Sequence, residues 1–484
     1  MADNIYDLRS FIERLEHEGE LARVKAEVDW KYELGAIAFK CLGPPAGPAL
    51  LFEKVKGYAT PVFTGGLLTL KRIALALGFH PGTDEATMVK ECARRLETPM
   101  KPSLVKTGPC KENKQFGKDV NVLKFPVPWW TEKDGGRYIG TWHQVMVKDP
   151  DSGWQNAGTY RMMLHDANTC GILFSPFQHI SLIHHKYLKM NKPTPIAITI
   201  GNDPACELVS ITPFPAGVSE WDMAGALRGR PIEVVKGETV DLLIPANAEI
   251  VIEGEIPIGE RRQEGPFGEH TGFYGGGKRP MPIVRVNCVT HRNEPIFRGS
   301  ILGKPVTEDH SCLSFVFASQ AMAMYKAAGF PGVTGVSYPA GGDPDFNAIV
   351  AIKKSYASQG LDAGRMLLAS KGGKMLKHVI VVDDDINIYD LNEILWSINT
   401  RFQASRQLYI TRYESGSRLD PSVPFDWMGI TDKMIMDATW PMTPDFPPRE
   451  EYGGAVHPPA VKPGEEARQL VEKRWQEYGI NWNK

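Results

Sequence analysis

The feature that most limits how this chain can fold is a period-two hydrophobic pattern in its middle third. Apolar side chains occupy alternate positions in short runs separated by glycines and prolines, and Ile196, Ile198 and Ile200 are the clearest example. Successive side chains of a strand point to opposite faces of a sheet, so this period predicts strands with one buried face. Regular short strands of this kind indicate a barrel or a sandwich-like β domain. Similar runs include Val145 and Val147, Tyr160 to Leu164, Ile250 and Ile252, and Val284 to Cys288.

The regions on either side have the mixed spacing of α/β structure. Leu8, Phe11, Ile12 and Leu15 recur at helical spacing near the N-terminus. Because 484 residues are too many for one simple core, two or three domains are expected. The changes of pattern after about residues 120 and 310 favour three parts, at residues 1–120, 121–310 and 311–484. Helices are predicted at residues 33–41, within 66–98, and at 220–227, 311–328, 361–370, 391–399 and 465–478, and strands at 21–28, 348–352 and 379–382.

Charge and composition exclude several classes of function. The net charge is −2 and the pI about 6.7, so no global field would attract nucleic acid or an anionic membrane. No apolar run approaches the ~18 residues of a membrane span, and the first residues are polar and charged. The seven cysteines are scattered without a CxxC pair, as is typical of reduced thiols. We therefore expect a soluble, cytoplasmic protein with no nucleic-acid partner.

Two glutamates five positions apart flank the turn Glu264-Gly-Pro-Phe-Gly-Glu269. Its glycines permit positive φ and its proline restricts one φ, so the turn can bring both carboxylates to one cavity. Burial or neighbouring negative charge would then raise the pKa of one carboxyl and place an acid beside a base. A solvated polar loop explains the same residues.

The segment Asn156-Ala-Gly-Thr-Tyr-Arg161 places an arginine in a predicted strand. The planar guanidinium suits a carboxylate or a phosphate. Asn156 and Arg161 have opposite parity, so a regular strand would point them to opposite faces, and a bulge at Gly158 could bring them together. An exposed strand arginine is the alternative interpretation.

Gln178, His179 and Glu220 are further candidates. Gln178 and His179 lie between a predicted strand and a predicted helix, and Glu220 lies in the first turn of the helix predicted at 220–227. The amide oxygen of Asn156, the imidazole of His179 and the carboxylate of Glu220 suit Mn²⁺ or Mg²⁺, with room left for a phosphate oxygen. Each residue alone also has a structural explanation, such as the helix dipole for Glu220.

In their order along the chain, these strings resemble the UbiD-type decarboxylases. This family includes polyprenyl-hydroxybenzoate, ferulate/cinnamate and (hetero)aromatic acid decarboxylases. The resemblance spans most of the chain, from the opening Asp7-Leu-Arg-Ser-Phe11 onward. Besides the Asn156 and Glu264 strings, it includes Gln178-His179-Ile180 and Val382-Asp-Asp-Asp-Ile386, followed by Trp396 and Thr400-Arg401.

The resemblance implies an α/β fold with a central split β-barrel that binds prenylated FMN. The C-terminal α/β region, with its terminal helix, would mediate assembly into a homo-oligomer, a dimer or hexamer. Asn156, His179 and Glu220 would be the ligands of a Mn²⁺ (or Mg²⁺) that also holds the cofactor phosphate. A flavin prenyltransferase would supply the cofactor. Contacts to the flavin are expected from Gly158, Thr159, Tyr160, Arg161 and Gln178, and a K⁺ is expected near Val209, Ser210, Thr212 and Glu220.

The implied lyase reaction is reversible, non-oxidative decarboxylation of an α,β-unsaturated or (hetero)aromatic carboxylic acid, or of an aryl-CoA thioester. Arg161 would orient the substrate carboxylate, Glu264 would hold Arg161, and Glu269 would protonate the carbon. Polyprenyl-hydroxybenzoate members usually carry Asp at the position of Glu269, so aromatic acid metabolism is favoured over ubiquinone biosynthesis. Leu313, Trp396 and residues 427–440 are candidates for the pocket wall. Two alternatives are a flavin-binding split-barrel oxidoreductase and a non-catalytic subunit of a carboxylase complex.

Overall fold

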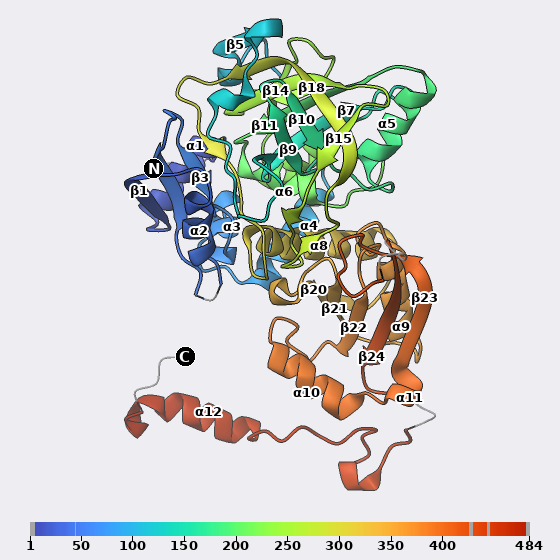
Figure 1. Cartoon of the computed structure of the whole chain (residues 1–484). Coiled ribbons are helices and arrows are strands. Elements are labelled where there is room, and N and C mark those ends of the chain that lie inside the picture. Colours follow the sequence, from blue (N-terminus) through green and yellow to red (C-terminus); the bar gives the residue numbers. More distant parts are fainter. Residues whose placement is uncertain (1–4, 44, 425–428, 443–445, 481–484) are drawn as a thin grey trace.

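The computed structural model describes residues 5–43, 45–424, 429–442 and 446–480 (Figure 1). Its N-terminal part is a four-stranded sheet in the order β1-β2-β3-β19, in which β19 (Phe297–Arg298) comes from much later in the chain. The buried residues of the first helix are the predicted Leu8, Phe11, Ile12 and Leu15. The other elements of this part are α1 (Leu8–His17), β1 (Leu21–Val28), α2 (Glu33–Lys40), β2 (Ala49–Val55), β3 (Val62–Thr64), α3 (Leu70–Ala76) and α4 (Glu85–Leu96).

The predicted β region forms one ten-stranded antiparallel sheet. Its order is β6-β9-β10-β18-β14-β11-β7-β8, and β5 and β15 also pair with β18. Among the described strands, β6 and β8 end this order and do not pair with each other, so the sheet is a curled half-barrel and not a closed barrel (Figure 1). The strands are β5 (Asn113–Phe116), β6 (Tyr138–Gly140), β7 (His143–Lys148), β8 (Gln155–Gly158), β9 (Met162–Asp166), β10 (Thr169–Ile172), β11 (Thr194–Ile200), β14 (Ile250–Ile256), β15 (Arg261–Glu264) and β18 (Arg279–His291).

Three helices lie between the strands of this sheet in sequence. The predicted helix is α7 (Glu220–Arg228), whose Ser219 side chain accepts a hydrogen bond from the Asp222 backbone. The helix expected after Gln178 is α5 (His179–Lys189), and α6 (Pro204–Ile211) was not predicted. Seven of the eight residues of α6 are buried, so it has no polar face and therefore no helical period in its sequence. Short accessory strands are β4 (Ser103–Leu104), β12 (Glu233–Lys236), β13 (Leu243–Pro245), β16 (Phe267–Gly268) and β17 (Tyr274–Gly275).

The C-terminal part begins with the long helix α8 (Glu308–Ala327) and contains a five-stranded sheet in the order β20-β21-β22-β24-β23. The three inner strands are parallel, and the edge strands β20 and β23 run antiparallel to their neighbours. Helix α12 (Glu465–Arg474) lies apart from the body of the molecule (Figure 1). The remaining elements are β20 (Val333–Ser337), β21 (Asn347–Ile352), α9 (Gln359–Ala369), β22 (His378–Asp383), α10 (Leu391–Arg401), α11 (Ala404–Gln407), β23 (Leu408–Ser415) and β24 (Ile430–Ala438).

Several contacts join the three parts. Strand β4 pairs with β12 and β5 pairs with β18, although both precede residue 120. The buried Arg298 donates to Glu308 at the start of α8, and Glu308 also accepts from the backbone of Leu67 at 2.6 Å. The central and C-terminal parts therefore close onto the N-terminal part, and the boundaries at residues 120 and 310 stay a prediction. Among the described residues, no helix has the length and apolar character needed to cross a membrane.

Candidate active site

The turn between the two predicted glutamates reverses the chain at the edge of the central sheet. Glu264 ends β15, and Gly265 follows with a φ of +87°. A Cβ at Gly265 would lie 2.5 Å from the Gly277 carbonyl oxygen, so both the conformation and the space require glycine here. Strand β16 then leads to Glu269. The carboxylates of Glu264 and Glu269 consequently approach the same side chain from opposite sides.

The side chain that both glutamates contact is that of Arg161. Its Nε and Nη2 donate to the two carboxylate oxygens of Glu264 at 2.9 and 2.7 Å, and Nη1 donates to Glu269. The side chains of Arg161, Glu264 and Glu269 are 8%, 0% and 6% exposed. Tyr138 donates to Glu264 at 3.0 Å, and burial together with the charge of Glu264 raises the pKa of Tyr138, so it stays a neutral donor. Such a bidentate pair fixes the orientation of the guanidinium.

The predicted single strand over residues 156–161 is wrong. Strand β8 ends at Gly158, and β9 begins only at Met162. Thr159, Tyr160 and Arg161 form the connection between them, where strand parity no longer applies. No bulge is therefore needed: Asn156 points from β8 toward α7, and Arg161 lies at the start of β9 near the Glu264 turn.

A second group of predicted residues lines one cavity and consists of Asn156, His179 and Glu220. The Asn156 amide donates to Glu220 at 2.7 Å, and the backbone of Ala157 donates to the other Glu220 oxygen at 3.1 Å. Burial raises the pKa of Glu220 to about 7. Burial and the charges of Lys371 and Lys374 lower the pKa of His179 to about 4, so its imidazole is neutral at physiological pH.

The cation beside this group is Lys371, which sequence reasoning missed. Its ammonium lies 2.8 Å from His179 Nε2 and donates to the Phe214 carbonyl at 2.6 Å. Burial lowers the pKa of Lys371 to about 8, although the charge of Glu220 acts in the opposite direction. A neutral imidazole, an amide oxygen and a buried carboxylate are a donor set that suits Mn²⁺ or Mg²⁺.

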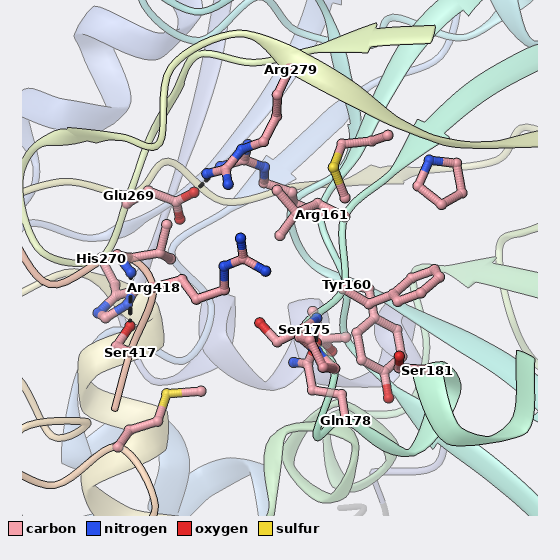
Figure 2. A pocket seen from close by; sticks show the side chains of 18 of the residues that line it. Tyr160, Arg161, Ser175, Gln178, Ser181, Glu269, His270, Arg279, Ser417 and Arg418 are labelled. Carbon is pink, nitrogen blue, oxygen red and sulfur yellow. Dashed lines mark hydrogen bonds and ion pairs between the residues drawn. The ribbon is translucent and has the colours of Figure 1, made fainter. Parts of the chain in front are cut away.

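The predicted residues line two adjoining cavities. The larger, of about 600 Å³, is lined by Arg161 and Glu269 (Figure 2), and the smaller, of about 260 Å³, by Asn156, Gly158, His179, Ser210, Thr212 and Glu220. Thr159, Tyr160 and Gln178 line both. Glu264 lines neither, because it lies behind Arg161. Val209 is buried at the end of α6 and does not reach the cavity wall. An elongated ligand with an anionic end fits this pair of cavities.

His270, next to Glu269, belongs to a buried network that joins the central and C-terminal parts. Its Nδ1 lies 3.0 Å from Asp343 and its Nε2 3.6 Å from Asp345. His310 Nε2 lies 2.8 Å from the His270 carbonyl, and His310 Nδ1 accepts from the Thr307 backbone. Ligand atoms of His270, His310 and Asp343 lie within 4.8 Å of one another, a spacing that a metal ion could use. The hydrogen bonds already engage these nitrogens, so we interpret the group as an ion-pair network.

This network predicts a pH-dependent stability. Burial alone lowers the pKa of His270, but the hydrogen bond with Asp343 and the charges of Asp345, Asp343 and Asp309 outweigh it and raise the pKa to about 9. A raised pKa stabilises the fold fully below pH ~6.5, and the contribution is lost as the pH rises through about 9. This contribution to the free energy of unfolding amounts to about 3 kcal/mol at most.

The free energies of unfolding of wild type and His270→Gln, measured in urea, should therefore differ less at pH 9.5 than at pH 6.5. Exposed His185→Gln is the control, and a difference that does not change with pH contradicts the assignment.

Several other residues of the site were not predicted. Arg279, Arg418 and Asp345 line the larger cavity, and nothing near them in the sequence marks them. Of the pocket-wall candidates, Leu313 lines the smaller cavity, whereas Trp396 is half exposed on α10 and packs over Arg401. Trp427 lies outside the described residues. A short-range signal existed only for His270, which adjoins Glu269.

Comparisons with known proteins find relatives along almost the whole chain. The 3-octaprenyl-4-hydroxybenzoate carboxy-lyase N-terminal, Rift-related and C-terminal domains match residues 12–96, 103–305 and 313–438. A pyrrole-2-carboxylic acid decarboxylase of Pseudomonas aeruginosa is 30% identical over 506 residues, covering 98% of each chain.

Two solved structures are also similar to the structure of this chain. The closed form of the vanillic acid decarboxylase of Sedimentibacter hydroxybenzoicus has a TM-score of 0.90 at 33% identity, covering 98% of this chain and 99% of that one. An evolved dimeric form of the UbiD-class enzyme HmfF from Pelotomaculum thermopropionicum, in complex with prFMN, has a TM-score of 0.81 at 32% identity and covers 97% and 100%. This chain therefore belongs to the UbiD family and is a UbiD-type carboxy-lyase.

Proposed function

We propose that this enzyme decarboxylates an aromatic or heteroaromatic carboxylic acid reversibly and without net oxidation, using prenylated FMN. The observation that carries the proposal is the Glu264–Arg161–Glu269 network at a cavity that adjoins the Asn156, His179 and Glu220 group. The similar proteins act on pyrrole-2-carboxylic acid and vanillic acid, which supports a ring-bearing substrate. An acrylic acid or an aryl-CoA thioester is the next candidate.

Residues of both cavities suit the cofactor. Asn156, His179 and Glu220 would hold a Mn²⁺ or Mg²⁺ that anchors the cofactor phosphate, with Lys371 beside it as a second cation. Thr159, Tyr160 and Gln178, which line both cavities, would contact the flavin between its phosphate and its ring. A K⁺ near Ser210 and Thr212 fits the same region. When bound, prenylated FMN supplies the electron sink for the charge that remains as CO₂ leaves.

The three residues of the network have distinct roles in this proposal. Arg161 binds the substrate carboxylate and orients the bond to be broken. Glu264 is fully buried and bidentate to Arg161, so it keeps the guanidinium in one orientation. Glu269 lies at the cavity wall on the other side of Arg161 and delivers the proton to the ring carbon.

The assembly is proposed to be a homo-oligomer, a dimer or hexamer, formed through the C-terminal part. The HmfF relative was solved in an evolved dimeric form. Large apolar side chains are exposed on this part, including Leu391, Leu395 and Trp396 on α10 and Ile410 on β23. Burial of exposed apolar side chains in a subunit interface would stabilise such an assembly. We also propose a cytoplasmic location and a flavin prenyltransferase as the source of the cofactor.

The proposed function is tested by a CO₂-release screen on enzyme made together with a flavin prenyltransferase and loaded with Mn²⁺. We expect release from at least one aryl or heteroaryl acid and little or none from the acrylic acids. Unmodified flavin together with NAD(P)H oxidation would support the oxidoreductase alternative instead. Intact cofactor and metal without CO₂ release from any acid would support a non-catalytic subunit.

A further inference from the structure

Glu269 is held less firmly by Arg161 than Glu264 is. Arg161 donates two hydrogen bonds to Glu264 and one to Glu269. A bidentate pair fixes orientation as well as distance, whereas a single contact lets a flexible side chain pivot about it. The Glu269 carboxylate points toward Arg161, and the side chain of its neighbour His270 extends in another direction (Figure 2). The residues next to Glu269 in the chain must therefore contribute to the position of its carboxylate.

The residues on either side of Glu269 are anchored to different parts of the fold. The backbone N–H of Gly268 donates to the buried carboxylate of Asp134, in the central part, at 2.9 Å. The side chain of His270 reaches the C-terminal part instead, where its Nδ1 lies 3.0 Å from Asp343. Glu269 is consequently located at a junction between these two parts of the molecule.

The C-terminal part contacts both the ring and the backbone of His270. The ring is buried against the carboxylates of Asp343 and Asp345, which lie in the loop between β20 and β21. The His270 carbonyl accepts from His310 Nε2 at 2.8 Å, and His310 lies in the first turn of α8. Two separate elements of the C-terminal part therefore hold the residue that follows Glu269.

The backbone of Asp343 has an uncommon conformation, with a φ of +61°. Residues other than glycine rarely adopt positive φ, and they keep it where the surrounding contacts require it. The Asp345 backbone N–H donates to Asp343 Oδ1 at 3.2 Å, and Asp343 Oδ2 lies 3.0 Å from His270 Nδ1. The loop therefore orients this carboxylate toward His270 through its own backbone.

We propose that His270 is a positioning residue for Glu269: its ion pair with Asp343 holds the segment that carries the acid, so that the Glu269 carboxylate stays at the cavity wall beside Arg161. The inference rests on the proposed function, in which Glu269 delivers the proton to the ring carbon. Proton delivery depends steeply on geometry, since a misplacement of about 1 Å can cost ~10²-fold in rate. An ion pair between two parts of the fold thereby becomes a requirement for turnover.

A double-mutant cycle on the cofactor-loaded enzyme tests this role. His270→Gln and Asp343→Asn should each lower kcat ~10-fold or more, with KM within about twofold of wild type and flavin content unchanged. The double variant should lose no more than either single variant, because each change breaks the same pair. Asparagine tolerates positive φ as aspartate does, so Asp343→Asn removes the charge and keeps the backbone. Steady-state CO₂ release gives kcat and KM, and absorbance gives flavin content.

A crystal structure of the cofactor-loaded His270→Gln variant provides a measurement that does not require turnover. Glu269 should have left its contact with Arg161, whereas the bidentate contact between Glu264 and Arg161 should remain. If wild type releases no CO₂ from any acid, the proposed function fails, and a displaced Glu269 in this variant still supports the positioning role. A Glu269 carboxylate that keeps its wild-type place in the variant overturns the role.

The control is Glu97→Gln, which breaks an exposed ion pair between the N-terminal part and Lys326 on α8, away from both cavities. Its kcat should equal that of wild type. Wild-type kcat in both single variants, or losses that add in the double variant, would contradict the proposal. A raised KM at unchanged kcat also overturns it, because His270, which lines the larger cavity, would then bind substrate. Loss of bound flavin in the single variants overturns it as well, since His270 would then serve the cofactor site.

Discussion

Replacing Glu269 with glutamine should lower kcat by ~10²–10⁴-fold while the cofactor stays bound. Glutamine keeps the size of the side chain and its place beside Arg161, but it has no acidic proton to deliver to the ring carbon. The position of Glu269 supports this role, because it is the carboxylate of the network that lines the cavity, whereas Glu264 lies behind Arg161. Steady-state CO₂ release gives kcat, and flavin absorbance reports cofactor content.

The matched control is Glu260→Gln, which changes an exposed glutamate that pairs with Arg285 outside the cavity. Its kcat should equal that of wild type. If Glu269→Gln turns over at the wild-type rate with full cofactor, another group delivers the proton. If it loses the cofactor, Glu269 acts in binding and the proposed assignment is wrong.

The second large effect is expected at the proposed metal site. His179→Ala should lower metal affinity by more than about 100-fold, because even partners outside the coordination sphere typically contribute 10–100-fold. Glu220→Gln should have a similar effect, because it removes the negative charge and keeps the side-chain shape. Because the metal would anchor the cofactor phosphate, the amount of bound flavin should fall together with the metal content. Elemental analysis after dialysis measures the metal, and absorbance measures the flavin.

Asp222→Asn is the control for Glu220→Gln, since Asp222 lies two residues further along in the first turn of α7. Its backbone N–H and not its carboxylate makes the cap contact with Ser219, so metal content should not change. Adding excess Mn²⁺ should restore part of the flavin content of the His179 variant. Wild-type metal and flavin contents in both variants would exclude this group as the metal site.

Local patterns predicted much of the fold. The alternation at Ile196, Ile198 and Ile200 became β11, and the helical spacing from Leu8 to Leu15 became α1. The prediction of α1 succeeded because one face of that helix is buried and the other is not. Strand β11 is buried on both faces, and its alternation separates the large isoleucines of one face from the smaller Ala197 and Thr199 of the other. The pattern failed at α6, which is buried on all sides, and at residues 159–161, where the chain leaves the strand. Periodicity reports only elements that have two different faces.

The motif strings, by their order along the chain, were enough to indicate the family and to name the Asn156, Arg161, His179, Glu220, Glu264 and Glu269 set. Only the tertiary structure decided how these residues are grouped: Arg161 meets a glutamate 103 positions away, and His179 meets Lys371 192 positions away. Lys371, Arg279 and Arg418 have ordinary local sequences, and their special environment comes from segments distant in the chain. Burial and charge at a point in space depend on everything folded around it, and no local sequence window contains that information.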